Sequence, residues 1–285
     1  MESQLQNLLP VSLGIIMFGI GLHLTFNDFL KVYKSPKAIF IGLVVQSIFL
    51  PFVCFLIAKY FALSPELAIG LMLLAASPGG VTANLYSHLF GGNVALNIAL
   101  TAINSVLIIF TMPFIVNLSI NYFLGFDKQI GLQFAKIVEV VAIVVLPVVF
   151  GIFVNSKYPH LAKKFEKIIK IASAIILAVL IIVVLIKENE VIASNLKQVG
   201  LSTLVFCLMS LTIGYIAGKI FGLREADSRA LSFEIGVHNS ALAIYLAINV
   251  LSNKVMSIPP VIYSIWMFPL AALFGFILTK IRAKS

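Results

Sequence analysis

Charged residues are scarce in this sequence of 285 residues: they make up 11% of it, against 61% hydrophobic residues. A soluble domain typically carries about 25% charged residues. The composition therefore excludes an ordinary soluble globular domain. It predicts an all-α, polytopic membrane protein in contact with lipid, because each roughly 20-residue apolar run is long enough for one spanning helix.

Acidic residues are fewer still, with 11 acids against 20 lysines and arginines and a formal net charge of +9. A basic excess can indicate nucleic-acid binding. Here the lysines fall in short loops between apolar runs, where they act as topology signals, so we expect no nucleic-acid partner. The only two cysteines, Cys54 and Cys207, lie within apolar runs without neighbours at metal-ligand spacing, which indicates buried thiols.

Catalytic motifs are also lacking. The sequence contains no G-x-x-x-x-G-K-[ST], no H-E-x-x-H and no G-x-S-x-G. The first absence argues against transport driven by ATP, and the other two against intramembrane hydrolysis. We therefore expect a protein that is not an enzyme.

Apolar runs bounded by charge, glycine and proline predict nine spans, at about 9–25, 38–58, 67–90, 93–121, 130–154, 168–186, 199–221, 227–251 and 258–279. Nine spans place the termini on opposite sides. Alternate loops then contain fourteen and five of the basic residues, with Lys136 left inside a span. The positive-inside rule thus predicts a plasma (inner) membrane protein with its N-terminus outside and its C-terminus in the cytoplasm.

Two spans are interrupted at membrane depth. The third contains Ser77-Pro78-Gly79-Gly80, and the eighth contains polar residues on both sides of Gly236. Unwound backbone is tolerated there only inside protein or beside a water-filled cavity. Paired interruptions are typical of secondary transporters built from inverted repeats. We therefore divide this single transporter domain into a first repeat, 1–121, which lacks its first helix, and a second, inverted repeat, 130–285.

Only two acids fall within the predicted spans. Glu139 has Lys136 one helical turn earlier, and a simple ion pair is the favoured interpretation. Glu234 has no basic residue within a turn and adjoins the second interruption. A carboxylate in low dielectric needs a cation, a partner or a proton, so Glu234 is the favoured functional acid.

Oxygen ligands for a monovalent cation are available near Glu234. Hard cations bind oxygen ligands. The candidates are the unwound backbone carbonyls of Ile235 and Val237 and the side-chain oxygens of Gln46, Asn84, Asn97 and Thr101. Each side chain has an alternative role in hydrogen bonding between membrane helices.

The half-helix after Gly79-Gly80 points its N-terminus at the membrane centre, which favours an anion there. Backbone N–H groups of Gly80 and Val81 and the side chains of Thr82, Asn84, Asn239 and Ser240 are candidate donors to a substrate carboxylate. The alternative is that these residues only cap broken helices. His238 lies in the break itself and either titrates near neutral pH or stays neutral in a hydrogen bond. His23, near a span end, is interpreted as interfacial.

The chain resembles the bile acid:sodium symporter family. Four segments look like that family's signatures: Gly19-Ile20-Gly21-Leu22 with Asp28-Phe29, Ser77-Pro78-Gly79-Gly80 with Asn84, Gly92-Asn93-Val94-Ala95-Leu96, and Glu234-Ile235-Gly236 with Asn239-Ser240. The resemblance spans nearly the whole chain. It implies a core domain with two crossed, broken helices, a panel domain, and sodium-coupled uptake of organic anions by alternating access. The usual member has ten helices, and this chain resembles one without the first.

The resemblance also implies two sodium sites. One would use Asn84, Thr101 and Glu234, and the other Gln46, Glu234 and the carbonyls of Ile235 and Val237. The chain departs from the family pattern at Ala83, Asn97 and His238. Asn97 can still offer an oxygen to the first site. His238 replaces a glutamine that is a ligand of the second site. Since a histidine nitrogen is a poor sodium ligand, the resemblance is weakest there.

The leading hypothesis is a secondary transporter that couples sodium to uptake of a small organic anion. The closest alternative is a transporter that is coupled to protons through Glu234 and His238, or uncoupled. An alternative of another class is a receptor or sensor that binds an anion without moving it.

Overall fold

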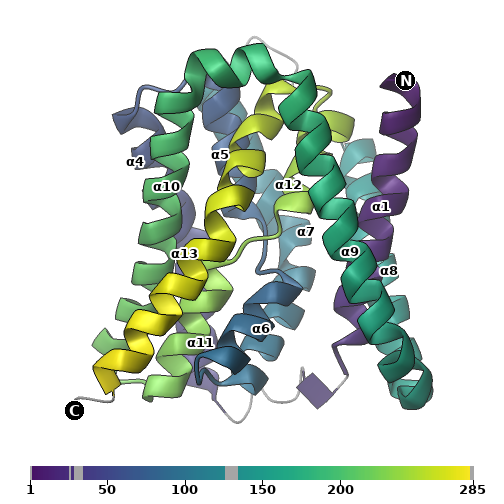
Figure 1. Ribbon diagram of the computed structural model, residues 1–285, viewed down its shortest axis with the longest axis vertical. Coiled ribbons are helices and arrows are strands. Elements are labelled where there is room, and N and C mark those ends of the chain that lie inside the picture. Colours follow the sequence, from purple (N-terminus) through teal and green to yellow (C-terminus); the bar gives the residue numbers. More distant parts are fainter. Residues whose placement is uncertain (1, 26, 29–34, 126–133, 283–285) are drawn as a thin grey trace.

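The computed structural model describes the backbone of residues 2–25, 27–28, 35–125 and 134–282. Every regular element in these ranges is a helix: α1 Glu2–Leu22, α3 Pro36–Val44, η2 Val45–Phe49, α4 Leu50–Tyr60, α5 Pro65–Ala76, α6 Val81–Leu89, α7 Val94–Leu124, α8 Phe134–Lys157, α9 Pro159–Lys187, α10 Asn189–Ile220, α11 Glu225–Gly236, α12 Ser240–Tyr245, η3 Leu246–Val250, η4 Val255–Ser257 and α13 Ile258–Arg282. The two termini lie at opposite ends of the bundle (Figure 1).

Each predicted span falls on one of these helices or on consecutive ones, the fifth from residue 134 onward. Among the described residues, four helical stretches are long and apolar enough to cross a membrane: Pro36–Tyr60, Val94–Leu124, Leu196–Ile220 and Val255–Lys280. Some helices begin earlier than the predicted spans. Helix α9 begins at Pro159 rather than near 168, and α10 at Asn189 rather than near 199, because lysine and glutamate at a membrane surface continue a helix readily.

Two pairs of short helices cross at their interruptions. Helices α5 and α12 lie in the upper half of Figure 1, and α11 and α6 in the lower half. At the crossing, Gly80 N–H donates to the Val237 carbonyl, and Asn239 N–H donates to the Pro78 carbonyl, both at 2.9 Å. This antiparallel bridge satisfies backbone groups that unwinding would otherwise leave unpaired in an apolar environment. We call this segment pair, residues 77–80 and 237–239, the crossover.

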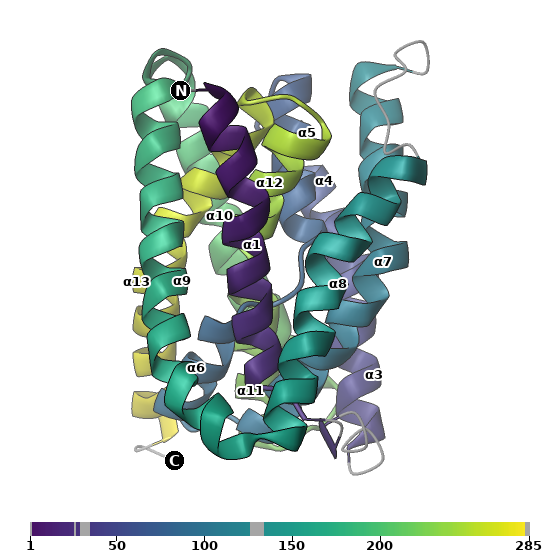
Figure 2. The same cartoon turned by 90° about the vertical axis from the view of Figure 1, so that its right-hand side faces the viewer.

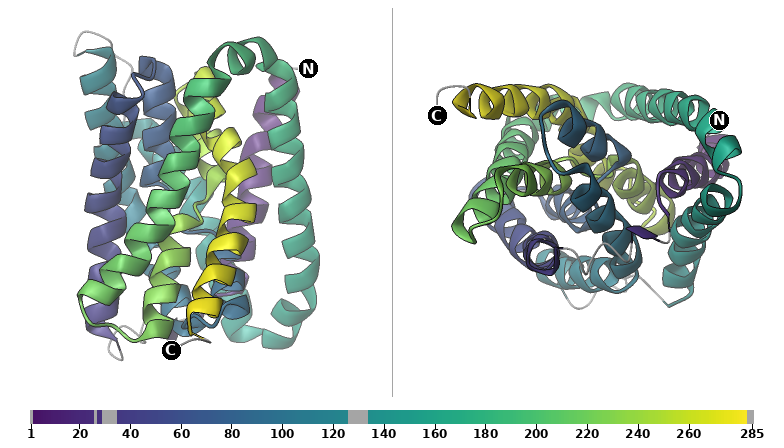
Figure 3. Two further views of the ribbon diagram at one scale, coloured as in Figure 1. Left: turned by 60° about the vertical axis from the view of Figure 1, so that its left-hand side comes forward. Right: turned by 90° about the horizontal axis from the view of Figure 1, so that it is seen from below.

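Helices α1, α8 and α9 pack mainly on one another and form a separate layer, which faces the viewer in Figure 2 and is seen from two further sides in Figure 3. Gly21 and Gly151 let α1 and α8 approach closely: a Cβ on Gly21 would lie 2.2 Å from the Val148 carbonyl oxygen. Asn155 Nδ2 also donates to the Leu24 carbonyl at 2.9 Å. The layer is therefore held by small residues and a polar contact, as is common between membrane helices.

Helices α10 and α11 pack through small residues as well. A Cβ on Gly218 would lie 2.5 Å from Ser228 Oγ and 2.7 Å from Ser228 Cα. On the same face, Ser232 Oγ donates to the Leu211 carbonyl at 2.7 Å. This close packing positions α11, the helix that ends at the crossover.

We expect Gly218→Ala to destabilise the protein by about 1–3 kcal/mol, because the added methyl group meets the backbone of α11. Thermal unfolding of the purified protein in detergent measures the effect. Gly200→Ala in the same helix is the control, since a Cβ there meets nothing within 4 Å. Equal unfolding temperatures for the two variants would contradict this account of the packing.

The turns before the two broken helices match in sequence and in hydrogen bonds. Lys59-Tyr60-Phe61-Ala62-Leu63 precedes α5, and Lys219-Ile220-Phe221-Gly222-Leu223 precedes α11. In each turn the third, fourth and fifth residues donate to equivalent carbonyls at 2.8 to 3.1 Å. The fourth residue has positive φ in both, 47° at Ala62 and 66° at Gly222.

A second pair of positions matches beyond the breaks. Asn93 Oδ1 accepts from Leu96 N–H at 3.2 Å, and Asn253 Oδ1 accepts from Met256 N–H at 3.2 Å. The two halves of the chain thus share local structure both before and after their broken helices.

Candidate functional site

The centre of the site is Glu234, in the last turn of α11 directly before the crossover. Its side chain is buried, and Thr101 Oγ1 on α7 donates to its Oε2 at 2.7 Å. The carboxyl group packs against Gly79, where a Cβ would lie 2.5 Å from Glu234 Cδ. The missing side chain at Gly79 therefore makes the space that the carboxyl group occupies.

No basic side chain of the described part of the chain forms an ion pair with Glu234. Arg229, five residues earlier, instead donates to Glu225 Oε1 and to the carbonyls of Phe90 and Leu278, each at 2.8 Å. It joins α11 to the end of α6 and to α13. The charge of an ionised Glu234 therefore needs a partner from outside the chain, or a proton.

Four buried side-chain oxygens of predicted cation ligands have no hydrogen-bond donor in the described structure: Gln46 Oε1, Asn84 Oδ1, Asn97 Oδ1 and Glu234 Oε1. Buried polar atoms are rarely left without a partner. All four atoms are acceptors and hard oxygen ligands, which a cation would satisfy. The donor set thus fits a monovalent cation such as sodium.

The residues of the first predicted ion site come from α6, α7 and α11, three helices that pack on one another. Asn84 lies on α6, and Asn97 and Thr101 share a face of α7. Asn97 Nδ2 donates to Ser87 Oγ on α6 and to the Ala230 carbonyl on α11, both at 2.9 Å. Its amide nitrogen is therefore used in interhelical bonds, while its oxygen is not.

The second predicted ion site is partly occupied by the chain's own hydrogen bonds. Gln46 Nε2 donates to the Ser77 carbonyl at 3.1 Å, and His238 Nδ1 lies 3.3 Å from the same oxygen. The Val237 carbonyl accepts from Gly80 N–H in the crossover. The prediction that the chain is unwound at Ile235 is wrong: α11 continues to Gly236, so Ile235 offers only a carbonyl of a helix end.

His238 is held as an aromatic side chain rather than as an exposed base. Its ring stacks on Phe206 at 5.6 Å between centroids and meets Tyr263 edge-on at 5.5 Å. Its Nε2 is buried without a hydrogen-bond partner among the described residues. His238 thus contributes a nitrogen where the other candidate ligands contribute oxygens.

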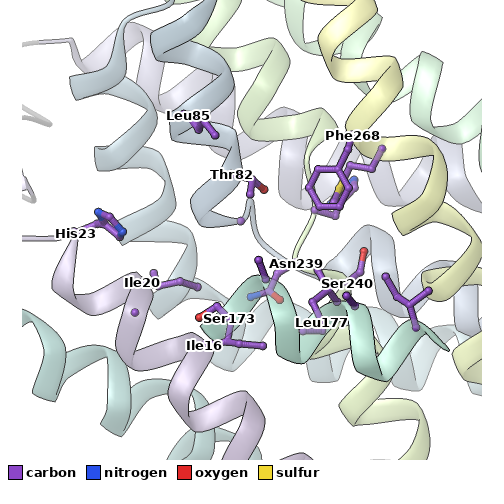
Figure 4. A pocket seen from close by; sticks show the side chains of 18 residues that line it. Ile16, Ile20, His23, Thr82, Leu85, Ser173, Leu177, Asn239, Ser240 and Phe268 are labelled. Atoms are coloured by element: carbon purple, nitrogen blue, oxygen red, sulfur yellow. The ribbon is translucent and has the colours of Figure 1, made fainter. Parts of the chain in front are cut away.

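A pocket of about 370 Å³ lies between the crossover and the helices α1, α9 and α13 (Figure 4). Four of the predicted substrate residues line it, namely Gly80, Thr82, Asn239 and Ser240. The side chain of Val81 lies outside the described residues, as do those of Glu139 and Lys136. The pocket wall is otherwise largely apolar, and its volume falls in the usual range for small-molecule sites.

Among the described residues that line the pocket there is no Lys, Arg, Asp or Glu. Its polar end is formed instead by the start of α6 at Val81 and by the crossover. The first N–H groups of a helix lack intrahelical partners and favour negative charge. A single carboxylate is therefore the kind of charge that this end can accept.

Two polar residues that line the pocket are not predicted from the sequence. His23, interpreted as interfacial, follows the end of α1, and Ser173 lies on α9; both line the pocket. A Cβ on Gly19 would lie 2.8 Å from Ile169 and 3.6 Å from Ser173 Oγ, so close packing of α1 on α9 sets this wall. No sequence motif marks these positions.

The fold contains two crossed helix breaks, a buried carboxyl group with free oxygens, and an apolar pocket. These features define a polytopic helical membrane transporter fold. The chain belongs to the Sodium Bile acid symporter family, whose model matches residues 10–195. The predicted family is confirmed, and it is a family of transporters rather than enzymes.

Similar proteins come from bacteria, plants and animals. The chain is 29% identical to a probable chloroplastic sodium/metabolite cotransporter of Arabidopsis thaliana, over 90% of this chain and 62% of the relative. It is 29% identical to an uncharacterized sodium-dependent transporter of Bacillus subtilis, over 90% and 78%. It is 27% identical to the human ileal sodium/bile acid cotransporter, over 95% and 78%. The chain thus spans about three fifths of the plant relative's length.

Proposed function

We propose that this protein is a secondary active transporter that couples sodium entry to uptake of a small organic anion. The observation that carries the proposal is the set of four buried oxygens without donors, one of them from Glu234 itself, together with a pocket whose polar end is a helix N-terminus. Sodium would be held by Glu234 with Asn84, Asn97 and Thr101. The names of the sodium-dependent relatives support the same coupling ion.

The substrate in this proposal is a monoanion with an apolar body. An apolar wall would bury the body, and Thr82, Asn239, Ser240 and the N–H groups of Gly80 and Val81 would meet the charge. One relative is named for bile acid and another for a metabolite, both organic substrates. A pocket of about 370 Å³ has room for a small member of this class.

The transport cycle would use two inverted repeats, 1–121 and 130–285. The matched turns at Ala62 and Gly222 and the matched asparagine caps at Asn93 and Asn253 support this division. The layer of α1, α8 and α9 would be the panel that moves against the remaining helices in alternating access. The excess of basic residues in one set of loops supports a plasma-membrane protein with an outside N-terminus and a cytoplasmic C-terminus.

Proton coupling is the second candidate, and His238 is the observation that favours it. Its unpartnered nitrogen lies where a sodium site would need an oxygen. In that mechanism Glu234 and His238 would carry the proton, and the second sodium site would not exist.

Uptake into proteoliposomes separates these mechanisms. A panel of labelled bile acids and smaller carboxylates is offered under an inward sodium gradient or an inward proton gradient, each imposed alone. We expect the sodium gradient to drive uptake and His238→Gln to retain it. If only the proton gradient drove uptake, and His238→Gln abolished it, the coupling ion would be the proton instead of sodium. Binding without uptake would indicate a receptor.

A further inference from the structure

Tyr263 of α13 reaches the end of α11, where the chain enters the crossover. Its hydroxyl group donates to the Gly236 carbonyl at 2.8 Å, and its side chain is completely buried. Gly236 is the last residue of α11 and follows Glu234 by two positions. Tyr263 is not among the described residues that line the pocket. It can therefore act on the site only through the residues that it contacts.

The backbone at Gly236 depends on a contact from outside its own helix. A Cβ at this position would lie 2.4 Å from Leu211 Cδ2 and 3.1 Å from Leu211 Cα, so the close packing of α10 requires glycine at the end of α11. Glycine restricts the backbone less than any other residue. Hydrogen bonds, rather than a side chain, must therefore fix the direction of the Gly236 carbonyl. The hydroxyl group of Tyr263 supplies such a bond.

The Gly236 carbonyl lies between the two carbonyls that are predicted cation ligands, those of Ile235 and Val237. The last carbonyls of a helix have no intrahelical donor. Here the Val237 carbonyl accepts from Gly80 N–H, and the Gly236 carbonyl accepts from Tyr263. A buried carbonyl without a donor is costly, so an unbonded Gly236 carbonyl would turn towards another donor or towards the cation. The bond from Tyr263 thus keeps this helix end in one arrangement.

The ring of Tyr263 makes a separate contact on the other side of the crossover. It meets the ring of His238 edge-on, with 5.5 Å between centroids. His238 lines the pocket. The hydroxyl group and the ring therefore contact different parts of the site. Phenylalanine separates the two contacts, because it keeps the ring and lacks the hydroxyl group.

We propose that Tyr263 is a positioning residue for the coupling cation. Under the function proposed above, on which this role rests, the cation is sodium. The hydroxyl group of Tyr263 fixes the last peptide of α11, and the fixed helix end holds Glu234 and the Ile235 carbonyl in the geometry that binds the cation. The ring supports the pocket wall through His238. Tyr263 thus serves both sides of the crossover without contacting the cation or the organic anion.

Tyr263→Phe tests the hydroxyl group in proteoliposomes. The probe is the labelled acid of the panel above that the wild-type protein takes up fastest. We expect the sodium concentration for half-maximal uptake to rise about tenfold, because a buried carbonyl loses its donor. The rate at saturating sodium and the KM of the acid there should stay close to the wild-type values.

Tyr86→Phe is the matched control. The hydroxyl group of Tyr86, on α6, donates to the Phe268 carbonyl of α13, also at 2.8 Å. This variant therefore loses an equivalent bond to α13 that does not involve α11, and it should keep the wild-type sodium dependence. Equal shifts of the sodium dependence in Tyr86→Phe and Tyr263→Phe would overturn the proposal.

Two further measurements separate positioning from a merely structural role. The rise in unfolding temperature that sodium causes should be smaller in Tyr263→Phe than in the wild type at the same sodium concentration. Tyr263→Leu, which also removes the ring, should in addition raise the KM of the acid at saturating sodium, and an unchanged KM would overturn the role of the ring.

A Tyr263→Phe protein that unfolds earlier but keeps the wild-type sodium dependence would refute the positioning role alone. Absence of sodium-driven uptake of every acid by the wild-type protein would refute the proposed function, and the positioning role with it.

Discussion

Glu234→Gln is expected to abolish sodium-driven uptake in proteoliposomes. The amide keeps the shape of the side chain and its bond to Thr101 but removes the charge that would hold the cation. Removing one member of a buried charge pair typically costs about 3–5 kcal/mol, which corresponds to at least a ~100-fold loss of sodium affinity. The measurement is the sodium dependence of uptake, together with the sodium-dependent rise in unfolding temperature of the purified protein.

The same variant distinguishes a binding role from a structural one. Without sodium, Glu234→Gln should be at least as stable as the wild type, because it no longer buries a carboxyl group without a cation. Adding sodium should then stabilise only the wild type. Glu66→Gln, in the first turn of α5, is the control and should behave as the wild type does. A Glu234→Gln protein that unfolds early without sodium would instead make Glu234 a structural residue.

Much of the fold could be predicted from the sequence, because apolar runs and helix breakers act locally. The pattern Ser77-Pro78-Gly79-Gly80 predicts an interruption, and the chain is unwound there. The second break is harder to predict from the sequence, because α11 contains Asp227, Ser228 and Arg229 and is barely apolar. The extent of its unwinding depends on the bridge to the first break, which is a tertiary contact. For this reason the sequence predicts unwinding at Ile235, whereas α11 continues to Gly236.

The candidate site could be predicted only in part. Residue chemistry selected Glu234 and its oxygen ligands, since a buried acid in an apolar run requires compensation. Which atoms remain free depends on contacts far apart in sequence, such as those of Asn97 Nδ2 with α6 and α11. The pocket walls from α1 and α9 carry no local signal. The repeated pattern Lys-x-Phe-x-Leu, at 59–63 and 219–223, was a sequence signal that could have revealed the matched turns.

The two glycines of the first break are expected to differ sharply when each is replaced by alanine. They are equivalent as helix breakers, but their surroundings are not. A Cβ on Gly79 would lie 2.5 Å from Glu234 Cδ and 2.6 Å from both carboxyl oxygens, whereas one on Gly80 meets nothing closer than 3.6 Å. The methyl group in Gly79→Ala must therefore displace the carboxyl group or separate the crossed helices.

Gly79→Ala should lose sodium-driven uptake and sodium-dependent stabilisation together, with a destabilisation of about 1–3 kcal/mol from overpacking. Gly80→Ala, which adds the same methyl group one residue later, should retain both, with uptake reduced at most through the pocket. Unfolding temperatures with and without sodium, measured for both variants, test the difference. Equal sodium responses in the two variants would mean that the carboxyl group is not held against Gly79. If Gly79→Ala lost only the stabilisation by sodium, with an unchanged unfolding temperature in its absence, the effect of the methyl group would be confined to the cation site. This outcome is open because the added Cβ meets Glu234 before any other side chain.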